Sequence, residues 1–282
     1  MKLTNIKYVR DLLERHGFEF KKRLGQNFLI NPSVCPRMAE LVADCESVLE
    51  IGAGIGVLTR ELAEVSEQVA AVEVDDRLIP ILSETLADCA NVEIIHGDIL
   101  KLDVKEIVGK LPGKTAVCAN LPYYITTPII ASLLEERVAV ERIIVMVQKE
   151  VATRLCAPLG SKESGAVSAL IDYYTVPKVE FSVSRGSFMP CPTVDSAVIS
   201  LSLKKEVPLA GRREAMFFKL VKAAFSQRRK TVTNTLGGFT GISKADFVSL
   251  CERAGISPGA RPQEIRLEQF VELASIWPMD DK

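Results

Sequence analysis

The stretch SVLEIGAGIG, residues 47–56, joins a short apolar run to a turn with three glycines, and the helical pattern GVLTRELAEV follows from residue 56. A strand that ends in a glycine-rich turn and enters a helix is typical of a β-α-β unit. The same alternation continues along the chain. Strand-like runs occupy 68–74, 92–98, 115–122 and 142–148, and helical runs occupy 76–87, 128–135, 149–157 and 165–174. This order predicts an α/β fold with a mostly parallel sheet.

Two later strand-like runs, KVEFSV at 178–183 and AVISLSL at 197–203, flank the proline-containing segment FMPCPTV at 188–194. They predict an antiparallel pair at the edge of the sheet. No strand pattern recurs beyond Lys205, where EVPLAGRR has the composition of a linker and short helical patterns follow. We therefore expect two domains, residues 1–205 with the sheet and residues 206–282 as a small all-α domain.

The overall composition is that of an ordinary globular protein. The chain has 282 residues, of which 48% are hydrophobic and 25% charged, and its net charge is −1. The first residues lack a continuous apolar segment, and no run approaches the ~18 apolar residues of a membrane span, so we expect a cytoplasmic protein. The seven cysteines contain no C-x-x-C pair and have no histidine cluster nearby, which argues against disulfides and against a metal site.

Basic residues gather in the segment RREAMFFKLVKAAFSQRRK, residues 212–230, which carries seven Lys/Arg against the single acid Glu214. On a helical wheel its apolar residues share one face, and Arg228 would fall on that face. The helix is therefore expected to end or bend near Ser226 and Gln227 and to present SQRRK as an exposed corner. At this point a solvated helix face and a polyanionic partner explain the charge equally well.

Ligands of an open parallel sheet collect at the carboxyl ends of its strands. Gly52, Gly54 and Gly56 follow the first strand with the spacing G-x-G-x-G, and Val57 stands where a dinucleotide fingerprint needs its third glycine. Glu73 ends the second strand and can accept hydrogen bonds from a ribose diol, while Asp98 ends the third and can hold a purine amino group. Each carboxylate alone is better explained by a solvated turn or a helix cap. Together they indicate a nucleoside cofactor without a pyrophosphate, such as S-adenosylmethionine.

The motifs EIGAGIG, VEVD, GD, NLPYYIT and FMPCPTVDS, with KKRLGQNFL upstream and AFSQRRKTVTNTL downstream, resemble the ribosomal RNA adenine N6-dimethyltransferase family over nearly the whole chain. The resemblance implies a class I methyltransferase domain at 1–205, with a Rossmann-like sheet and a basic N-terminal segment, and a helical RNA-binding domain at 206–282. It also implies S-adenosylmethionine as the methyl donor. The expected cofactor-binding residues are Asn27, Leu29, Gly52, Gly54, Glu73, Asp98 and Asn120.

The cluster CANLPYYITTP, residues 118–128, would carry the chemistry. An exocyclic adenine amine is a poor nucleophile because its lone pair is delocalised into the ring. The Asn120 side-chain oxygen and, by the resemblance, the Leu121 carbonyl would each accept one amine hydrogen, while Tyr123 and Phe188 would stack on the two faces of the base. Tyr124 is interpreted as a core residue, and Phe188 is expected on an exposed loop because prolines follow it.

The resemblance implies 16S rRNA as the substrate, within the small ribosomal subunit or its precursor, with two adjacent adenosines of the last hairpin loop as targets. We expect a monomer. The expected RNA-binding residues are Lys22, Arg23, Lys222, Arg228, Arg229 and Lys230. Three alternatives remain: a 23S rRNA adenine N6-methyltransferase of the macrolide-resistance type, a protein-glutamine methyltransferase with a similar Asn-Pro-Pro-Tyr turn, and a non-enzymatic ribosome-assembly factor.

Overall fold

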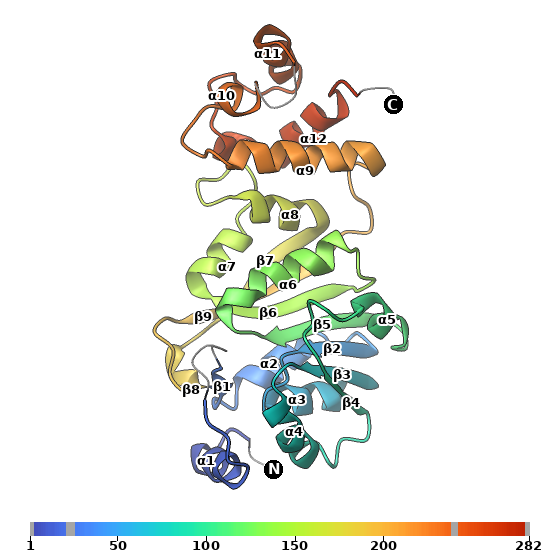
Figure 1. The fold of residues 1–282 in the computed structure, drawn as a ribbon, viewed down its shortest axis with the longest axis vertical. Coiled ribbons are helices and arrows are strands. Elements are labelled where there is room, and N and C mark those ends of the chain that lie inside the picture. Colours follow the sequence, from blue (N-terminus) through green and yellow to red (C-terminus); the bar gives the residue numbers. More distant parts are fainter. Residues whose placement is uncertain (1–2, 21–25, 238–241, 280–282) are drawn as a thin grey trace. The chain divides into compact units, whose positions relative to one another are not determined.

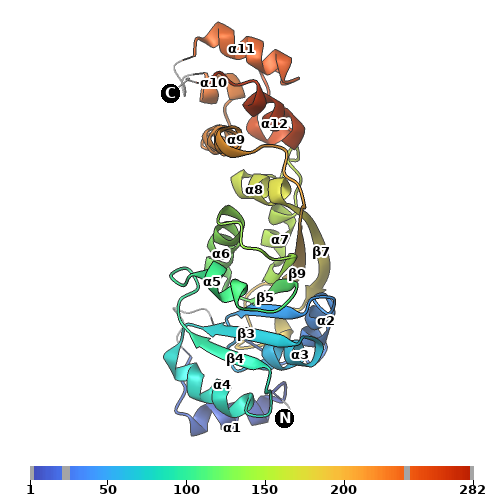
Figure 2. The same ribbon diagram turned by 90° about the vertical axis from the view of Figure 1, so that its right-hand side faces the viewer.

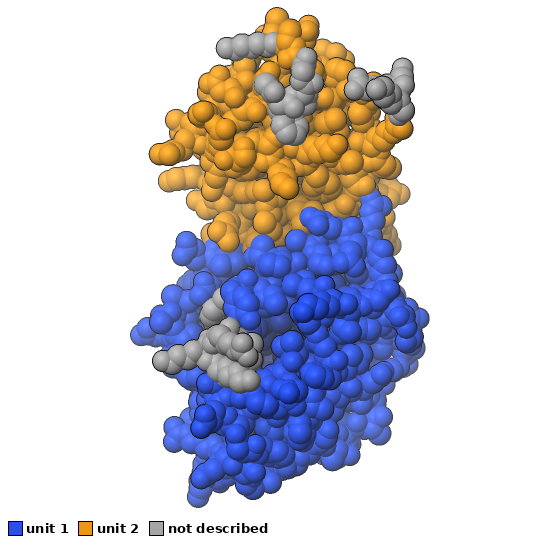
Figure 3. Space-filling view, in the orientation of Figure 1, with its two compact units in different colours: residues 1–152, 178–203 blue, residues 153–177, 204–282 orange. Residues whose placement is uncertain are grey.

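The structure is a computed structural model that describes residues 3–20, 26–237 and 242–279. The chain divides into two compact units, which are considered one at a time (Figure 3). The first comprises residues 1–152 and 178–203, and the second comprises residues 153–177 and 204–282. Within the described residues, no helix combines the length and the apolar character needed to cross a membrane.

A seven-stranded sheet forms the centre of the first unit (Figure 1). Its strands, in spatial order, are β4 (Val92–His96), β3 (Gln68–Glu73), β2 (Ser47–Ile51), β5 (Thr115–Asn120), β6 (Arg142–Gln148), β9 (Ser196–Leu203) and β7 (Thr175–Val183). The first three residues of β7 are assigned to the second unit. The first five strands run parallel, and β9 is antiparallel to β6. Every residue of β2 is buried, as expected of a central strand that is covered on both faces. The predicted α/β fold with an antiparallel edge is confirmed.

Helices flank this sheet. They are α2 (Val34–Glu40), α3 (Val57–Val65), α4 (Ile79–Thr85), α5 (Val104–Gly109), α6 (Tyr123–Glu135) and α7 (Lys149–Leu155). Figure 2 shows α2 and α3 on one side of the sheet and α6 on the other. Met38 of α2 and Leu62 of α3 are fully buried against Val48 of β2, so this layer is close-packed and holds the turn between β2 and α3 in place.

The N-terminal segment packs through apolar side chains against the turn after β2 and against α4. In α1 (Ile6–Arg15) the side chain of the preceding Asn5 caps the helix by accepting a hydrogen bond from the Tyr8 amide at 3.1 Å. The buried residues of α1 pack in one cluster with Phe28. Phe28–Leu29 forms the short strand β1, which pairs antiparallel with β8 (Phe188–Met189). The last two residues of GQNFL and the first two of FMPCPT, which are far apart in the sequence, therefore lie side by side.

The second unit is helical and has its own core. It contains α8 (Ala166–Tyr174), α9 (Gly211–Phe225), α10 (Val232–Leu236), α11 (Lys244–Arg253) and α12 (Leu267–Ser275). The helix α9 ends at Phe225, so the predicted end near Ser226 is confirmed. The division of the chain differs from the single boundary expected near residue 205, because Tyr173 of α8 is fully buried with Phe217 of α9. The ring centroids of Tyr173 and Phe217 are 4.7 Å apart.

Candidate active site

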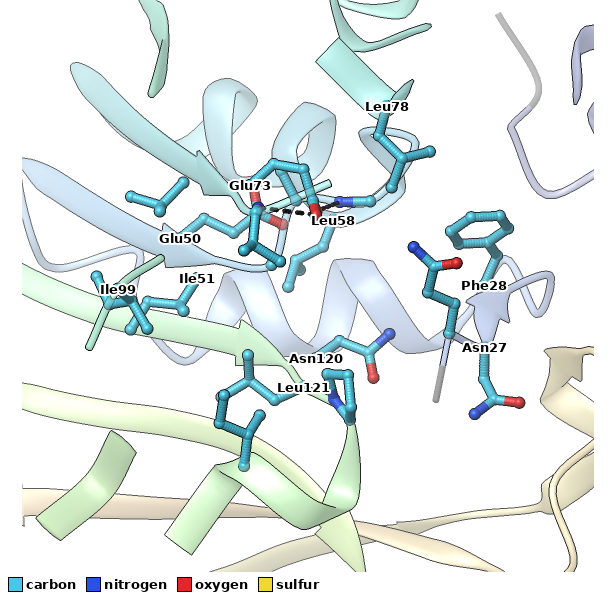
Figure 4. Close-up of a pocket in the computed structure, with 18 of the residues that line it drawn as sticks. Asn27, Phe28, Glu50, Ile51, Leu58, Glu73, Leu78, Ile99, Asn120 and Leu121 are labelled. Atoms are coloured by element: carbon cyan, nitrogen blue, oxygen red, sulfur yellow. Dashed lines mark hydrogen bonds between the residues drawn. The ribbon is translucent and has the colours of Figure 1, made fainter. Parts of the chain in front are cut away.

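A cavity of about 240 Å³ opens at the carboxyl ends of β2, β3, β4 and β5 (Figure 4). All its lining residues belong to the first unit. They include eight of the residues expected from the sequence to bind the cofactor or the target base: Asn27, Leu29, Gly52, Gly54, Glu73, Asp98, Asn120 and Leu121. Phe188, the partner of Leu29 in the β1–β8 pair, also lines it. The topology of the sheet thus brings together side chains that are spread over most of the first unit.

The turn after β2 depends on its glycines. Gly52 and Gly54 have φ values of +80° and +62°, which side chains rarely adopt. A Cβ atom on Gly52 would lie 3.3 Å from Leu121 Cδ2, and one on Gly54 would lie 3.5 Å from the Phe28 ring. The bare backbone of this turn therefore forms one wall of the cavity, and a side chain at either position would narrow it.

Glu73 is held by the backbone around it. Its Oε2 accepts a hydrogen bond from the Gly54 amide at 2.8 Å, and its Oε1 accepts from the amides of Val74 and Asp75 at 2.9 Å each (Figure 4). Burial raises the pKa of this carboxyl, and the three amide donors partly offset that rise. A carboxylate has about four acceptor positions, so Oε2 keeps one for a ligand. The carboxylate is thus oriented in advance for a hydroxyl donor.

Asp98 follows β4 and stays accessible from the cavity. Its side chain is 32% exposed, and its Oδ1 accepts a hydrogen bond from the Leu100 amide at 3.2 Å. The ammonium of Lys101 lies 3.5 Å from Oδ2 but is 82% exposed, so this pair is weak. Oδ2 therefore remains open to a second donor such as an exocyclic amine.

Two acceptors that the sequence did not single out are buried in the cavity wall. Gln26 Oε1 and Glu50 Oε2 accept no hydrogen bond from any described residue. The amide nitrogen of Gln26 donates to Asp75 at 2.9 Å, which fixes its orientation. Burial raises the pKa of Glu50, which is 1% exposed, to about 8, and the nearby Thr59 hydroxyl partly offsets that rise. Buried acceptors without partners are costly, so both indicate a ligand with a donor group such as an ammonium. In the sequence, the only indication of their role was that Gln26 lies in the motif GQNFL and Glu50 in the motif EIGAGIG.

The amide of Asn120 projects into the cavity from the end of β5 (Figure 4). It makes no side-chain hydrogen bond with another described residue, so both its oxygen and its nitrogen are available to a ligand. Leu121 is 5% exposed and packs toward Gly52. Pro122 comes next, just before α6 begins. This arrangement presents one amide and a rigid backbone turn to whatever enters the cavity.

The aromatic residues differ from the expectations. Phe188 is only 4% exposed, because its pairing with β1 places it in the core, so the prediction of an exposed loop is wrong for this residue. Tyr124 lines the cavity and is 62% exposed, so its interpretation as a core residue is wrong too. It stands in the first turn of α6, where the helix meets the cavity rather than the core. The side chain of Tyr123 lies outside the described part of the structure.

The predicted RNA-binding residues fall into two groups. Lys22 and Arg23 lie outside the described residues. Lys222, Arg228, Arg229 and Lys230 are exposed in the second unit, at the end of α9 and just beyond it. Within the described residues, no group of three or more His, Cys, Asp or Glu side chains has the arrangement of a metal site.

The comparisons with known proteins agree with this site. The family "Ribosomal RNA adenine dimethylase" matches residues 17–277. A Ribosomal RNA small subunit methyltransferase A of Clostridioides difficile (strain 630) is 40% identical over 279 residues, 98% of this chain and 96% of the relative. A protein of the same name from Geobacillus sp. (strain WCH70) is 42% identical over 275 residues, 95% of this chain and 94% of the relative.

Two solved structures share the fold over most of the chain. The 23S rRNA methyltransferase ErmE superposes with a TM-score of 0.71 at 28% identity and covers 88% of this chain and 98% of its own. A dimethyladenosine transferase from Plasmodium falciparum superposes with a TM-score of 0.72 at 24% identity and covers 87% of this chain and 95% of its own. The chain therefore belongs to the ribosomal RNA adenine dimethylase family and is an S-adenosylmethionine-dependent rRNA adenine dimethyltransferase.

Proposed function

We propose that the protein dimethylates N6 of two adjacent adenosines in the 3′-terminal hairpin loop of 16S rRNA, within the small ribosomal subunit or its precursor. Relatives named for the small subunit, at 40% and 42% identity over nearly the whole chain, support this choice. The structure named for 23S rRNA is only 28% identical. We further propose that the protein acts in the cytoplasm as a monomer and assists small-subunit biogenesis.

The residues of the cavity fit S-adenosylmethionine. Glu73 would hold the ribose hydroxyls and Asp98 the adenine amine, with Asn27 and Leu29 beside the glycine turn. The unpaired Gln26 Oε1 and Glu50 Oε2 match the ammonium of the methionine portion, which would remove the cost of two orphaned buried acceptors. When bound, the cofactor supplies an electrophilic methyl group on a sulfonium.

One observation carries the catalytic role: the Asn120 amide projects into the cavity with no partner among the described residues. Its oxygen and the carbonyl of Leu121 would each accept one hydrogen of the adenine N6 amine. Both bonds draw the amine out of conjugation and direct its lone pair toward the methyl group. A carboxamide does not act as a base at neutral pH, so the excess proton would leave to water after methyl transfer. Positioning is then the main catalytic contribution, and it can amount to ~7–11 kcal/mol.

Aromatic side chains would hold the target base once it leaves its stack. Unstacking costs a few kcal/mol, and base–aromatic stacking returns ~1–3 kcal/mol per contact. Phe188 lines the cavity from a fixed position in β8, which suits it to one face of the base. We assign the opposite face to Tyr123, and the neighbouring nucleotide to the exposed ring of Tyr124.

Labelled S-adenosylmethionine would test the proposal. The protein is incubated separately with unmethylated small and large ribosomal subunits, and the labelled nucleotide is mapped. Two N6,N6-dimethylated adenosines near the 3′ end of 16S rRNA are expected. Label on a large-subunit adenosine would overturn the substrate assignment in favour of the 23S activity. The absence of label from both subunits, with cofactor binding intact, would favour an assembly factor.

A further inference from the structure

The loop from residue 158 to residue 165, here called the α8 loop, is held by internal hydrogen bonds in the second unit. Its backbone turns twice, through hydrogen bonds from the Ser161 amide to the Pro158 carbonyl at 3.2 Å and from the Ser164 amide to the Ser161 carbonyl at 3.1 Å. Ser164 is fully buried, and the Leu159 amide donates to Asp172 of α8 at 3.0 Å. These contacts fold the loop on itself and tie its first residues to α8.

Arg228 fastens this loop to the corner that follows α9. Its Nη2 donates to the carbonyl of Lys162 at 3.1 Å and to the carbonyl of Ser164 at 2.8 Å. Both bonds come from one nitrogen, whose two hydrogens have fixed directions in the guanidinium plane, whereas an ammonium stands on a flexible stem. The corner SQRRK and the α8 loop, which are separated by more than sixty positions in the sequence, therefore meet through this side chain.

The two segments together present a basic surface. Lys162, Arg228, Arg229 and Lys230 are exposed, and the only acid among the exposed residues of the two segments is Glu163. Within the described residues, none of these four cations forms an ion pair with a carboxylate. Cations on a solvated helix face are usually neutralised in part by nearby acids. A cluster held in place by backbone contacts without such neutralisation fits a polyanion instead.

We propose that the α8 loop and the corner after α9 form one phosphate-binding surface for the substrate RNA, in which Lys162 and Arg229 contact phosphates and Arg228 is a positioning residue. Arg228 acts by holding the Lys162 backbone beside the corner, so its charge is not its main contribution. The inference rests on the proposed function because it takes ribosomal RNA as the polyanion. It adds Lys162 to the binding surface and changes the role predicted for Arg228.

Salt dependence of binding separates the two roles. Loss of one phosphate contact lowers the slope of log affinity against log salt by about 0.9, which corresponds to about eight-fold weaker binding at 0.1 M salt. Lys162→Ala is expected to show both changes. Arg228→Lys keeps the charge but not the rigid plane that directs the two Nη2 hydrogens at the carbonyls, so it is expected to show the same loss. In the double variant the two losses should not add, because Arg228 acts through Lys162.

The experiment measures binding of the full-length chain to unmethylated small and to unmethylated large subunits at several salt concentrations. Lys110→Ala, an exposed lysine of the first unit, is the charge control, and thermal unfolding with cofactor binding checks that each variant is folded. Wild-type affinity and slope for Arg228→Lys, additive losses in the double variant, or an unchanged slope for Lys162→Ala would each overturn the inference. So would failure of the wild-type protein to bind either subunit. Tighter binding to large subunits would count against the proposed substrate alone, because the variant series can be read on whichever subunit binds.

Discussion

Glu50 offers a quantitative test of the cofactor pocket. Its carboxyl is buried beneath the glycine turn, and burial raises its pKa from 4.5 to about 8. The folded state therefore keeps a proton that the unfolded state has lost between those two pH values. The sign follows from this difference: the contribution of Glu50 to the free energy of unfolding is highest below pH 4.5 and falls as the pH rises toward 8.

The magnitude follows from the size of the shift. Each unit of pKa difference corresponds to about 1.4 kcal/mol, so between pH 5 and pH 9 the ionisation of Glu50 removes about 4 kcal/mol of stability. Glu50→Gln cannot ionise and is expected to lack this loss. At pH 5 the variant should be less stable than the wild-type protein by about 1–3 kcal/mol, because the amide adds buried donors without partners. At pH 9 it should be the more stable of the two.

Urea unfolding of the wild-type protein, Glu50→Gln and the exposed control Glu64→Gln across this pH range provides the measurement. Parallel pH dependence for the wild-type protein and Glu50→Gln would refute the reasoning. The same carboxyl predicts proton release on cofactor binding near pH 7, because an ammonium beside it favours the ionised form. Calorimetry in two buffers of different ionisation enthalpy should detect release in the wild-type protein and none in Glu50→Gln.

Three further substitutions test the walls of the cavity. Gly52→Ala introduces a side chain at a φ of +80° and 3.3 Å from Leu121. It should lower the free energy of unfolding by about 1–2 kcal/mol and weaken cofactor binding. Unchanged cofactor affinity would contradict the account. Phe188 is 4% exposed, so Phe188→Ala should lower the free energy of unfolding, measured by denaturant titration, by about 3–5 kcal/mol. A change below 1 kcal/mol would be inconsistent with its place in the core. The side chain of Tyr124 is 62% exposed, so Tyr124→Ala should change the free energy of unfolding by no more than about 0.5 kcal/mol. The same substitution should raise KM for RNA several-fold, because it removes a stacking contact. An unchanged KM would remove its proposed stacking role.

The sequence allowed much of the pocket to be predicted because parallel strands share one edge. Each strand run ends in a recognisable polar or glycine residue, so Gly52, Glu73, Asp98 and Asn120 could be expected to converge without knowledge of the coordinates. The prediction needed only the strand ends and the rule that neighbouring strands run in the same direction.

The errors came from contacts that are not local in the sequence. The exposure of Phe188 was judged from the prolines that follow it, but its pairing with Leu29 decides its burial. For Tyr124 the misleading signal was its place in an aromatic pair at the end of a strand. The sequence does not show that the first turn of α6 directs this side chain toward the cavity. The boundary near residue 205 missed Tyr173, whose partner Phe217 lies on a later helix. Gln26 and Glu50 emerge only when hydrogen-bond partners can be counted.

The catalytic claim for Asn120 is tested most directly by single-turnover methyl transfer with Asn120→Ala on unmethylated small subunits. Affinities for RNA and for S-adenosylmethionine are measured alongside, so that a loss of rate can be separated from a loss of binding. The account predicts a methyl-transfer rate lower by on the order of 10²-fold or more, with RNA affinity unchanged. A rate within a few-fold of the wild-type protein would contradict it.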